Sequence, residues 1–271
     1  MQATVAEDLN IMRIGIFVAT LMLMMGLERL LPRRKLDYSV LLRWRTNLSM
    51  IVIDTAVVRL LVPMTTVGIA AIASDRGWGL LHIVNWPMLV ETVFAVLLLD
   101  FAIYLQHVAS HRFSVLWKIH QVHHSDPDID TTTGIRFHPA EIVLSMLYKF
   151  FLIFLLGPSV FAVVFFEIVL NTTAVFNHAN FRIPSALDRI IRLLVVTPDV
   201  HRIHHSVIRQ ERDSNYGFNL TIWDRLCRTW TEQPEHGHTE MEIGMKAHRG
   251  NEPIQLRWSL LLPFRRKNWK K

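Results

Sequence analysis

Histidine is the residue type whose spacing in this sequence points most directly to chemistry. The chain has 271 residues and 14 histidines, ten of them between His107 and His205. An HxxxH motif is followed by two HxxHH motifs, made by His107 and His111, then His120, His123 and His124, then His201, His204 and His205. On a helix, positions i, i+3 and i+4 share a face, so each motif should direct its imidazoles toward one locus. Chance would supply roughly 0.04 HxxHH matches at this histidine frequency, so two matches indicate a shared task.

Metal binding is the chemistry that this pattern favours. The eight clustered imidazoles and the isolated His178 exceed the needs of one ion and suit two ions with open coordination positions. Imidazole binds Fe, Zn, Cu and Ni, so ligand type alone does not name the metal. Zinc is redox-inert and would imply hydrolysis, and the sequence has no HExxH motif to supply a general base. Open positions suit O₂ activation, so we expect two iron ions.

The elements that must position these histidines are apolar. Hydrophobic residues make up 51% of the chain and the mean hydropathy is +0.27, values that suggest a bilayer. Four apolar regions span residues 11–31, 48–73, 87–106 and 142–176, and Gly157-Pro158 divides the last into a hairpin. We therefore expect an all-α integral membrane protein with about three transmembrane helices, a split membrane hairpin and a cytoplasmic, histidine-rich helical cap.

Charge predicts the orientation. The first connector carries five basic residues, whereas the second, around residues 74–85, has Arg76 beside Asp75. The basic residues of the first connector are Arg33, Arg34, Lys35, Arg43 and Arg45, and those of the C-terminus are Arg265, Arg266, Lys267, Lys270 and Lys271. Positive-inside reasoning puts both groups, and with them the histidines, in the cytoplasm. We expect a multi-pass protein of a bacterial inner membrane, without a cleaved signal peptide because Glu7 and Asp8 stand where one would be basic.

The order of the motifs resembles the fatty acid hydroxylase and sterol desaturase superfamily over about residues 85–230. The flanking residues are similar as well: Trp117-Lys118, Arg136-Phe-His138-Pro139-Ala-Glu141, Asn215-Tyr216-Gly217 and Trp223-Asp224-Arg225. Two positions depart from the pattern, since Val108 stands where many members have Arg and Arg228-Thr229 where many have Gly-Thr. Neither departure removes a ligand.

This resemblance implies a site and a reaction. The implied di-iron ligands are His107, His111, His120, His123, His124, His178, His201, His204 and His205. The implied reaction is O₂-dependent hydroxylation or desaturation of a C–H bond of a fatty acyl, sterol or ether lipid, with hydroxylation or ether-lipid monooxygenation favoured. Electrons would come from a separate ferredoxin or cytochrome b5 type of donor, because the sequence shows no fused redox domain and no Gly-rich dinucleotide motif. No catalytic residue beyond the metal centre is implied.

The expected organisation is one membrane-embedded domain, residues 1–271. Residues 1–84 would form the N-terminal transmembrane helices, 85–230 the catalytic histidine region and 231–271 a basic cytoplasmic tail. The basic residues gather beside apolar runs, which fits lipid headgroups better than nucleic acid. The single Cys227 excludes an internal disulfide and any CxxC motif.

Several other polar residues carry expectations. Asp100, two helical turns before His107, is a candidate to hold a ligand imidazole in place, with an interfacial polar residue as the alternative. His138 is either a similar support or a loop anchor. Asp54 and Arg59 should face protein and form an ion pair with each other or with a neighbour, rather than contact a substrate. Three residues are expected to brace the cap, Asn215, Tyr216 and Asp224, and three to be solvated, His236, His238 and His248.

Two other classes of protein remain open. A bis-His haem electron carrier would place single histidines mid-span on facing helices, and here the histidines cluster beyond the spans. A metal transporter would line a path through the bilayer midplane with ligands, for which Asp54 is the one candidate. Metal content and O₂ consumption separate these readings from the oxygenase.

Overall fold

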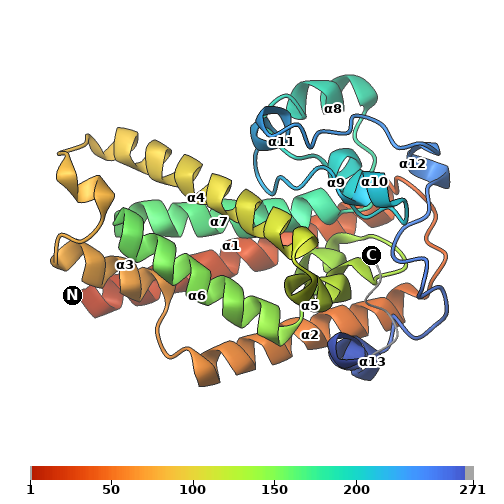
Figure 1. Cartoon of the computed structure of the whole chain (residues 1–271), viewed down its shortest axis with the longest axis horizontal. Coiled ribbons are helices and arrows are strands. Elements are labelled where there is room, and N and C mark those ends of the chain that lie inside the picture. The colour runs from red at the N-terminus through yellow and green to blue at the C-terminus, as the bar shows by residue number, and fades with distance from the viewer. Residues whose placement is uncertain (1, 266–271) are drawn as a thin grey trace.

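The computed structural model describes residues 2–265, and its regular elements in that range are all helices. The long ones are α1 (Gln2–Leu30), α2 (Val40–Leu61), α4 (Met88–Arg112), α6 (Pro139–Leu156) and α7 (Val160–His178). Five segments within residues 11–178 are long and apolar enough to cross a membrane. The predicted all-α fold with membrane-spanning helices is confirmed, and Figure 1 shows these helices side by side as an elongated bundle.

The second apolar region, predicted as one span over residues 48–73, is not a single helix. It is divided into α2 and α3 (Thr66–Asp75), with a break at residues 62–65. Pro63 explains the break because it lacks an amide donor, and Thr65 starts the new helix by accepting a hydrogen bond from the Gly68 amide at 3.0 Å. The helix α2 also begins eight residues before the predicted position 48, since Arg43 and Asn47 face buried polar partners rather than lipid.

The hairpin is divided where the sequence predicts. The helix α6 ends at Leu156, Gly157 takes a left-handed φ of 64°, and Ser159 caps α7. A Cβ on Gly79, which leads into η1 (Leu80–Ile83), would lie 2.2 Å from the Gly157 nitrogen, so only glycines permit this close approach. With 18 and 19 residues, α6 and α7 are each about 28 Å long, and both are long and apolar enough to cross a membrane.

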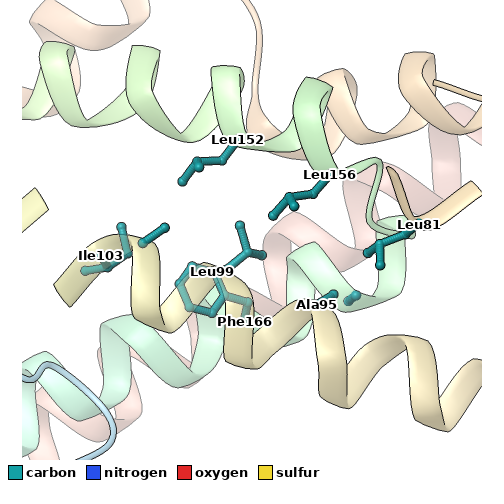
Figure 2. Packing of buried hydrophobic residues seen from close by; sticks show 9 residues of the cluster. Leu81, Ala95, Leu99, Ile103, Leu152, Leu156 and Phe166 are labelled. Carbon is teal, nitrogen blue, oxygen red and sulfur yellow. The ribbon is translucent and has the colours of Figure 1, made fainter. Parts of the chain in front are cut away.

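The core of the bundle lies between α4, α6, α7 and η1. Figure 2 shows its buried side chains, with Leu99, Leu152 and Phe166 pointing toward one another from three helices. Large apolar side chains are exposed on the outer faces of the five long helices, and these include Met22, Val52, Phe94, Phe151 and Phe161. Apolar residues both inside and outside are the pattern of a lipid-embedded bundle.

The remaining elements form a cap at one end of the bundle (Figure 1). They are α5 (Ser114–His124), η2 (Thr131–Ile135), α8 (Ser185–Ile191), α9 (Pro198–His204), α10 (Arg209–Arg212), α11 (Ile222–Leu226), α12 (Gly237–Glu240), α13 (Leu256–Leu261) and η3 (Leu262–Phe264). Residues 231–265 do not extend away as a tail, because Trp258 and Leu262 pack against Met50 and Val122. The predicted basic residues Arg266, Lys267, Lys270 and Lys271 lie outside the described residues.

Candidate metal centre

The nine predicted ligands come together at the junction of the bundle and the cap. They form two groups, in each of which one ligand atom per residue lies within 4.8 Å of the others. The five-histidine cluster contains His107, His111, His120, His124 and His204, and the four-histidine cluster contains His123, His178, His201 and His205. All nine side chains are buried. The helix α7 ends at His178, and α9 begins with Thr197 at the N-cap and Pro198 in its first turn.

The two HxxHH motifs do not each point to one locus as the spacing suggested. His120 and His124 join the five-histidine cluster while His123 joins the other. In the third motif, His204 joins the five-histidine cluster, and His201 and His205 join the other. The clusters adjoin, because the ring centroids of His124 and His205 are 4.6 Å apart and those of His120 and His123 are 5.4 Å apart. Each HxxHH motif therefore contributes histidines to both of the two neighbouring clusters.

Hydrogen bonds to the outer ring nitrogens set the direction of five imidazoles. Nδ1 lies 2.7 Å from the Tyr216 carbonyl in His107 and 2.7 Å from the Ser214 carbonyl in His204. It lies 3.2 Å from the Arg136 carbonyl in His123 and 2.6 Å from the Ala174 carbonyl in His178. His120 Nδ1 lies 2.6 Å from Glu141 Oε1. A carbonyl oxygen only accepts, so Nδ1 must carry the proton in the first four rings. Their Nε2 atoms then present lone pairs inward.

The inward nitrogens lack protein partners that could satisfy them. The Nε2 atoms of His107, His120 and His204 are buried without a hydrogen-bond partner among the described residues. His178 Nε2 lies 3.2 Å from His123 Nε2 and 3.1 Å from His201 Nε2. Because His123 and His178 both donate through Nδ1, their Nε2 lone pairs face each other and repel. A cation between these rings would turn that repulsion into coordination, so the residues present fit bound metal.

Burial keeps the rings outside the membrane spans neutral. Burial and then repulsion from neighbouring imidazoles lower the pKa of His123 well below its usual range. Burial is also the main cause that lowers the pKa of His124, His201, His204 and His205. A neutral imidazole is the form that binds metal, so the fold favours the ligating state at neutral pH.

The Asn215-Tyr216-Gly217 loop is held within the cap, and it supplies the carbonyl that contacts His107. Asn215 has a φ of 50°, and its amide donates to the carbonyls of Val200 and Thr231 at 3.1 and 2.8 Å. Asp224 accepts from the amides of Tyr216 and Gly217, each at 2.8 Å. This bracing fixes the Ser214 and Tyr216 carbonyls that orient His204 and His107.

A buried ionic network behind the second motif was missed by sequence reasoning. Arg43, predicted to be a cytoplasmic connector charge, is fully buried and pairs with Asp126 at 2.7 Å and with Asp130. Arg136 donates to the Val122 carbonyl at 2.9 Å and to Asn47 at 2.8 Å. The sequence feature that could have indicated this network is the run of acidic and hydroxyl residues at 125–133, directly after His124.

Asp100 and His138, the two candidates to support a ligand imidazole, hydrogen-bond to groups other than the clustered histidines. Asp100 accepts from Asn219 at 2.9 Å and from the Trp223 indole at 2.7 Å, so both of its oxygens are engaged away from the imidazoles. His138 is the N-cap of α6 and lies 3.2 Å from the Leu260 carbonyl, as a loop anchor would.

Two expectations about charge are corrected. His238 was expected to be solvated, but it is buried 3.7 Å from Asp199, whereas His236 is exposed. Among the described residues, Asp54 and Arg59 form an ion pair neither with each other nor with a neighbour. They lie five positions apart on α2, Asp54 being buried and Arg59 exposed, so the helix presents them in different directions.

A cavity of about 660 Å³ adjoins the five-histidine cluster. His107 and His120 line it beside residues of α1, α2, α6 and α7 and the break between α2 and α3. Gly134 also lines it, and a Cβ there would lie 2.6 Å from the Ala174 carbonyl and 3.2 Å from His178 Nδ1. The cavity thus connects the interior of the bundle with the five-histidine cluster.

The sequence profile of the fatty acid hydroxylase family matches residues 92–229, just over half of the chain, which include all nine histidines. The chain belongs to this family, and the predicted resemblance is confirmed.

The chain is similar to ornithine lipid hydroxylase OlsE of Rhizobium tropici, with 29% identity over 167 residues, 61% of this chain and 49% of that protein. It is also similar to the alkylglycerol monooxygenases of Xenopus tropicalis, with 30% identity over 50% of this chain and 29% of that protein, and of Homo sapiens, with 30% over 52% and 31%. It thus spans at most about half the length of these relatives. No solved structure matches the chain significantly.

The carboxylate of Glu141 should control metal affinity through His120. Replacing Glu141 with alanine removes the acceptor 2.6 Å from His120 Nδ1, and we expect iron affinity to fall about 10–100-fold. Competition with a chelator measures this change. The matched control is Glu91→Ala. Glu91 lies on α4 sixteen positions before His107, and it accepts a hydrogen bond from Ser159 rather than from a histidine. Unchanged iron affinity in Glu141→Ala would contradict the assigned role.

Proposed function

We propose that this protein is a membrane-bound, O₂-dependent di-iron enzyme that hydroxylates a C–H bond of a lipid. The observation that carries the proposal is the pair of adjoining, buried histidine clusters beside a cavity within apolar helices, in which Nε2 of His107, His120 and His204 has no partner among the described residues. Family membership and the relatives named as lipid hydroxylase and monooxygenase support the same reaction class. The nine histidines of the two clusters are the proposed ligands.

The roles of the protein groups follow from their contacts. Bound iron would supply the redox chemistry by which O₂, two electrons and two protons convert C–H to C–OH and water. The carbonyls of Tyr216, Ser214 and Arg136 accept from Nδ1 of three imidazoles, those of His107, His204 and His123. These hydrogen bonds orient the rings and keep the proton on Nδ1. The buried cap separates the clusters from bulk water, and the cavity positions the substrate C–H bond. Electrons come from a separate donor of the ferredoxin or cytochrome b5 type.

We also propose one domain over residues 1–271 and a cytoplasmic position for the metal centre at a bacterial inner membrane. Arg33 supports this orientation because it donates to Asp199 at 3.0 Å, joining the basic first connector to the start of α9. Burial would raise the pKa of Asp199, but the charge of Arg202 and the hydrogen bond from Arg33 lower it to about 2. This ion pair holds the connector and the third motif on the same side of the bundle.

Metal analysis and isotope labelling test the proposal. Protein purified in detergent from iron-supplemented cells should contain about two irons per chain, with a coupled Mössbauer signal. With a reductant, a redox partner and a panel of lipids, ¹⁸O from ¹⁸O₂ should appear in a hydroxylated product. Full occupancy by a redox-inert metal, a haem spectrum, or metal uptake by liposomes without O₂ consumption would favour the transporter or haem reading instead.

A further inference from the structure

A carboxylate on α1 reaches the segments that surround the metal centre. Glu28 lies near the end of this helix, outside residues 92–229 that the family profile matches, and is only 6% exposed. Its Oε2 atom accepts from the Thr131 amide at 2.9 Å and from the Thr131 hydroxyl at 2.8 Å. The same oxygen accepts from the Asn180 amide at 3.1 Å. Thr131 begins η2 and Asn180 follows α7, so Glu28 ties η2 to the end of α7.

Both of these segments lie next to His178. Asn180 is two residues beyond it in the chain. Gly134 in η2 is so close that a Cβ there would lie 2.6 Å from the Ala174 carbonyl oxygen and 3.2 Å from His178 Nδ1. That carbonyl oxygen lies 2.6 Å from His178 Nδ1 and accepts its hydrogen bond. The helix η2 therefore packs on both the ring and the acceptor that orients it, a close approach that a glycine allows.

His178 needs such support more than the other ligands do. The other eight belong to motifs of two or three histidines, whereas His178 stands alone and is the last residue of α7. A helix end lacks the hydrogen bonds that fix a helix interior. Yet His178 Nε2 lies 3.2 Å from His123 Nε2 and 3.1 Å from His201 Nε2. Turning this ring away would open the four-histidine cluster, while the five-histidine cluster does not include it.

Loss of the Glu28 carboxylate should loosen η2 from α7 without unfolding the protein. The connector after α1 is bonded to the segment after α7 independently, because the Arg33 amide donates to the Asn180 carbonyl at 3.0 Å. The helix η2 is also bonded to α2, where the Asn47 amide group donates to the Thr132 hydroxyl at 2.9 Å. Among the described residues, the hydrogen bonds from α1 to η2 are those of Glu28. The effect of removing it should therefore be local.

We propose that Glu28 is a positioning residue for His178. Its carboxylate holds η2 against the end of α7, and η2 keeps the His178 ring directed toward His123 and His201. Glu28 thus supports the four-histidine cluster and not the five-histidine cluster. This inference rests on the metal binding of the proposed function, and it adds a residue from outside the family-matched region to the support of one metal position.

Cobalt(II) titration of the metal-free protein in detergent tests this inference without turnover. Co(II) accepts imidazole ligands, and its visible absorption follows each site as it fills. The unaltered protein should bind two ions. In Glu28→Ala, we expect one ion to bind as before and the other about 10–100-fold more weakly, the usual loss when the support of a ligand is removed. Equal weakening of both ions, or no weakening, would overturn the proposal.

The conservative variant separates positioning from charge. Glu28→Gln keeps a side-chain oxygen that can accept the same hydrogen bonds, so it should bind both ions as the unaltered protein does. Glu28→Gln that binds the second ion as weakly as Glu28→Ala would show that the hydrogen bonds to η2 and Asn180 are not what matters.

Two glycine variants test the route through η2. Gly134→Ala should weaken the same ion, whereas Gly26→Ala, on α1 where a Cβ meets nothing within 4 Å, should weaken neither. Because Glu28→Ala and Gly134→Ala disturb one contact, the double variant should bind the second ion about as weakly as the weaker single variant. Multiplied losses would overturn this route. Intact cobalt binding without ¹⁸O incorporation by the iron-loaded protein would count against the hydroxylase function alone.

Discussion

Replacing His204 or His123 with alanine is expected to remove iron and abolish lipid hydroxylation. The two residues belong to different clusters, so each substitution removes one ligand from one proposed iron position. Loss of a supporting hydrogen bond to a ligand typically costs 10–100-fold in metal affinity, so loss of the ligand itself should cost more than about 100-fold. Iron content per chain, the Mössbauer signal and ¹⁸O incorporation measure the effect.

A histidine outside the clusters provides the control for these two variants. His236 is exposed and belongs to neither cluster, so His236→Ala should retain wild-type iron content and activity. Because the two clusters adjoin, loss of one iron should also disturb the coupled signal of the other. Wild-type iron content in either cluster variant would refute the ligand assignment for that residue.

Replacing Arg43 with alanine is expected to be the most destabilising change outside the histidines. Arg43 is fully buried on α2 and pairs with Asp126 and Asp130, which lie just after the second motif. Removing it leaves two buried carboxylates without their counter-charge, and breaking a buried ion pair in this way costs about 3–5 kcal/mol. Thermal unfolding in detergent measures the loss.

A neighbouring arginine provides the comparison. Arg45 lies on the same helix but is exposed, so Arg45→Ala should change the stability by no more than about 0.5 kcal/mol. We expect Arg43→Ala also to bind iron less tightly, because Asp126 and Asp130 lie within the segment that joins His124 to Arg136. Equal stability of the two arginine variants would mean that the network is not required for the fold.

The sequence alone determined the features that depend on local spacing. Apolar runs of sufficient length identified membrane helices, and Gly157-Pro158 located the turn between α6 and α7. The spacing of the three motifs selected eight of the nine histidines that the structure brings together, because i, i+3 and i+4 positions share a helix face whatever surrounds the helix. The ninth, His178, stands alone in the sequence. The predicted family followed from the same residues.

Only the tertiary structure decided how these residues are shared and supported. Each HxxHH motif divides between two clusters because α5 and α9 lie between two groups of neighbouring rings, which spacing along one helix does not specify. Asp100 lies on the same helix as His107 yet bonds to Asn219 and Trp223, and Arg43 looks like a connector charge yet is buried. Hydropathy treats a charged residue as exposed, but a buried partner distant in sequence can stabilise it inside the protein. The charged cavity that joins Asp54, Glu141, Lys149 and Glu167 arises in the same way, from four side chains on three helices that meet only in the folded bundle.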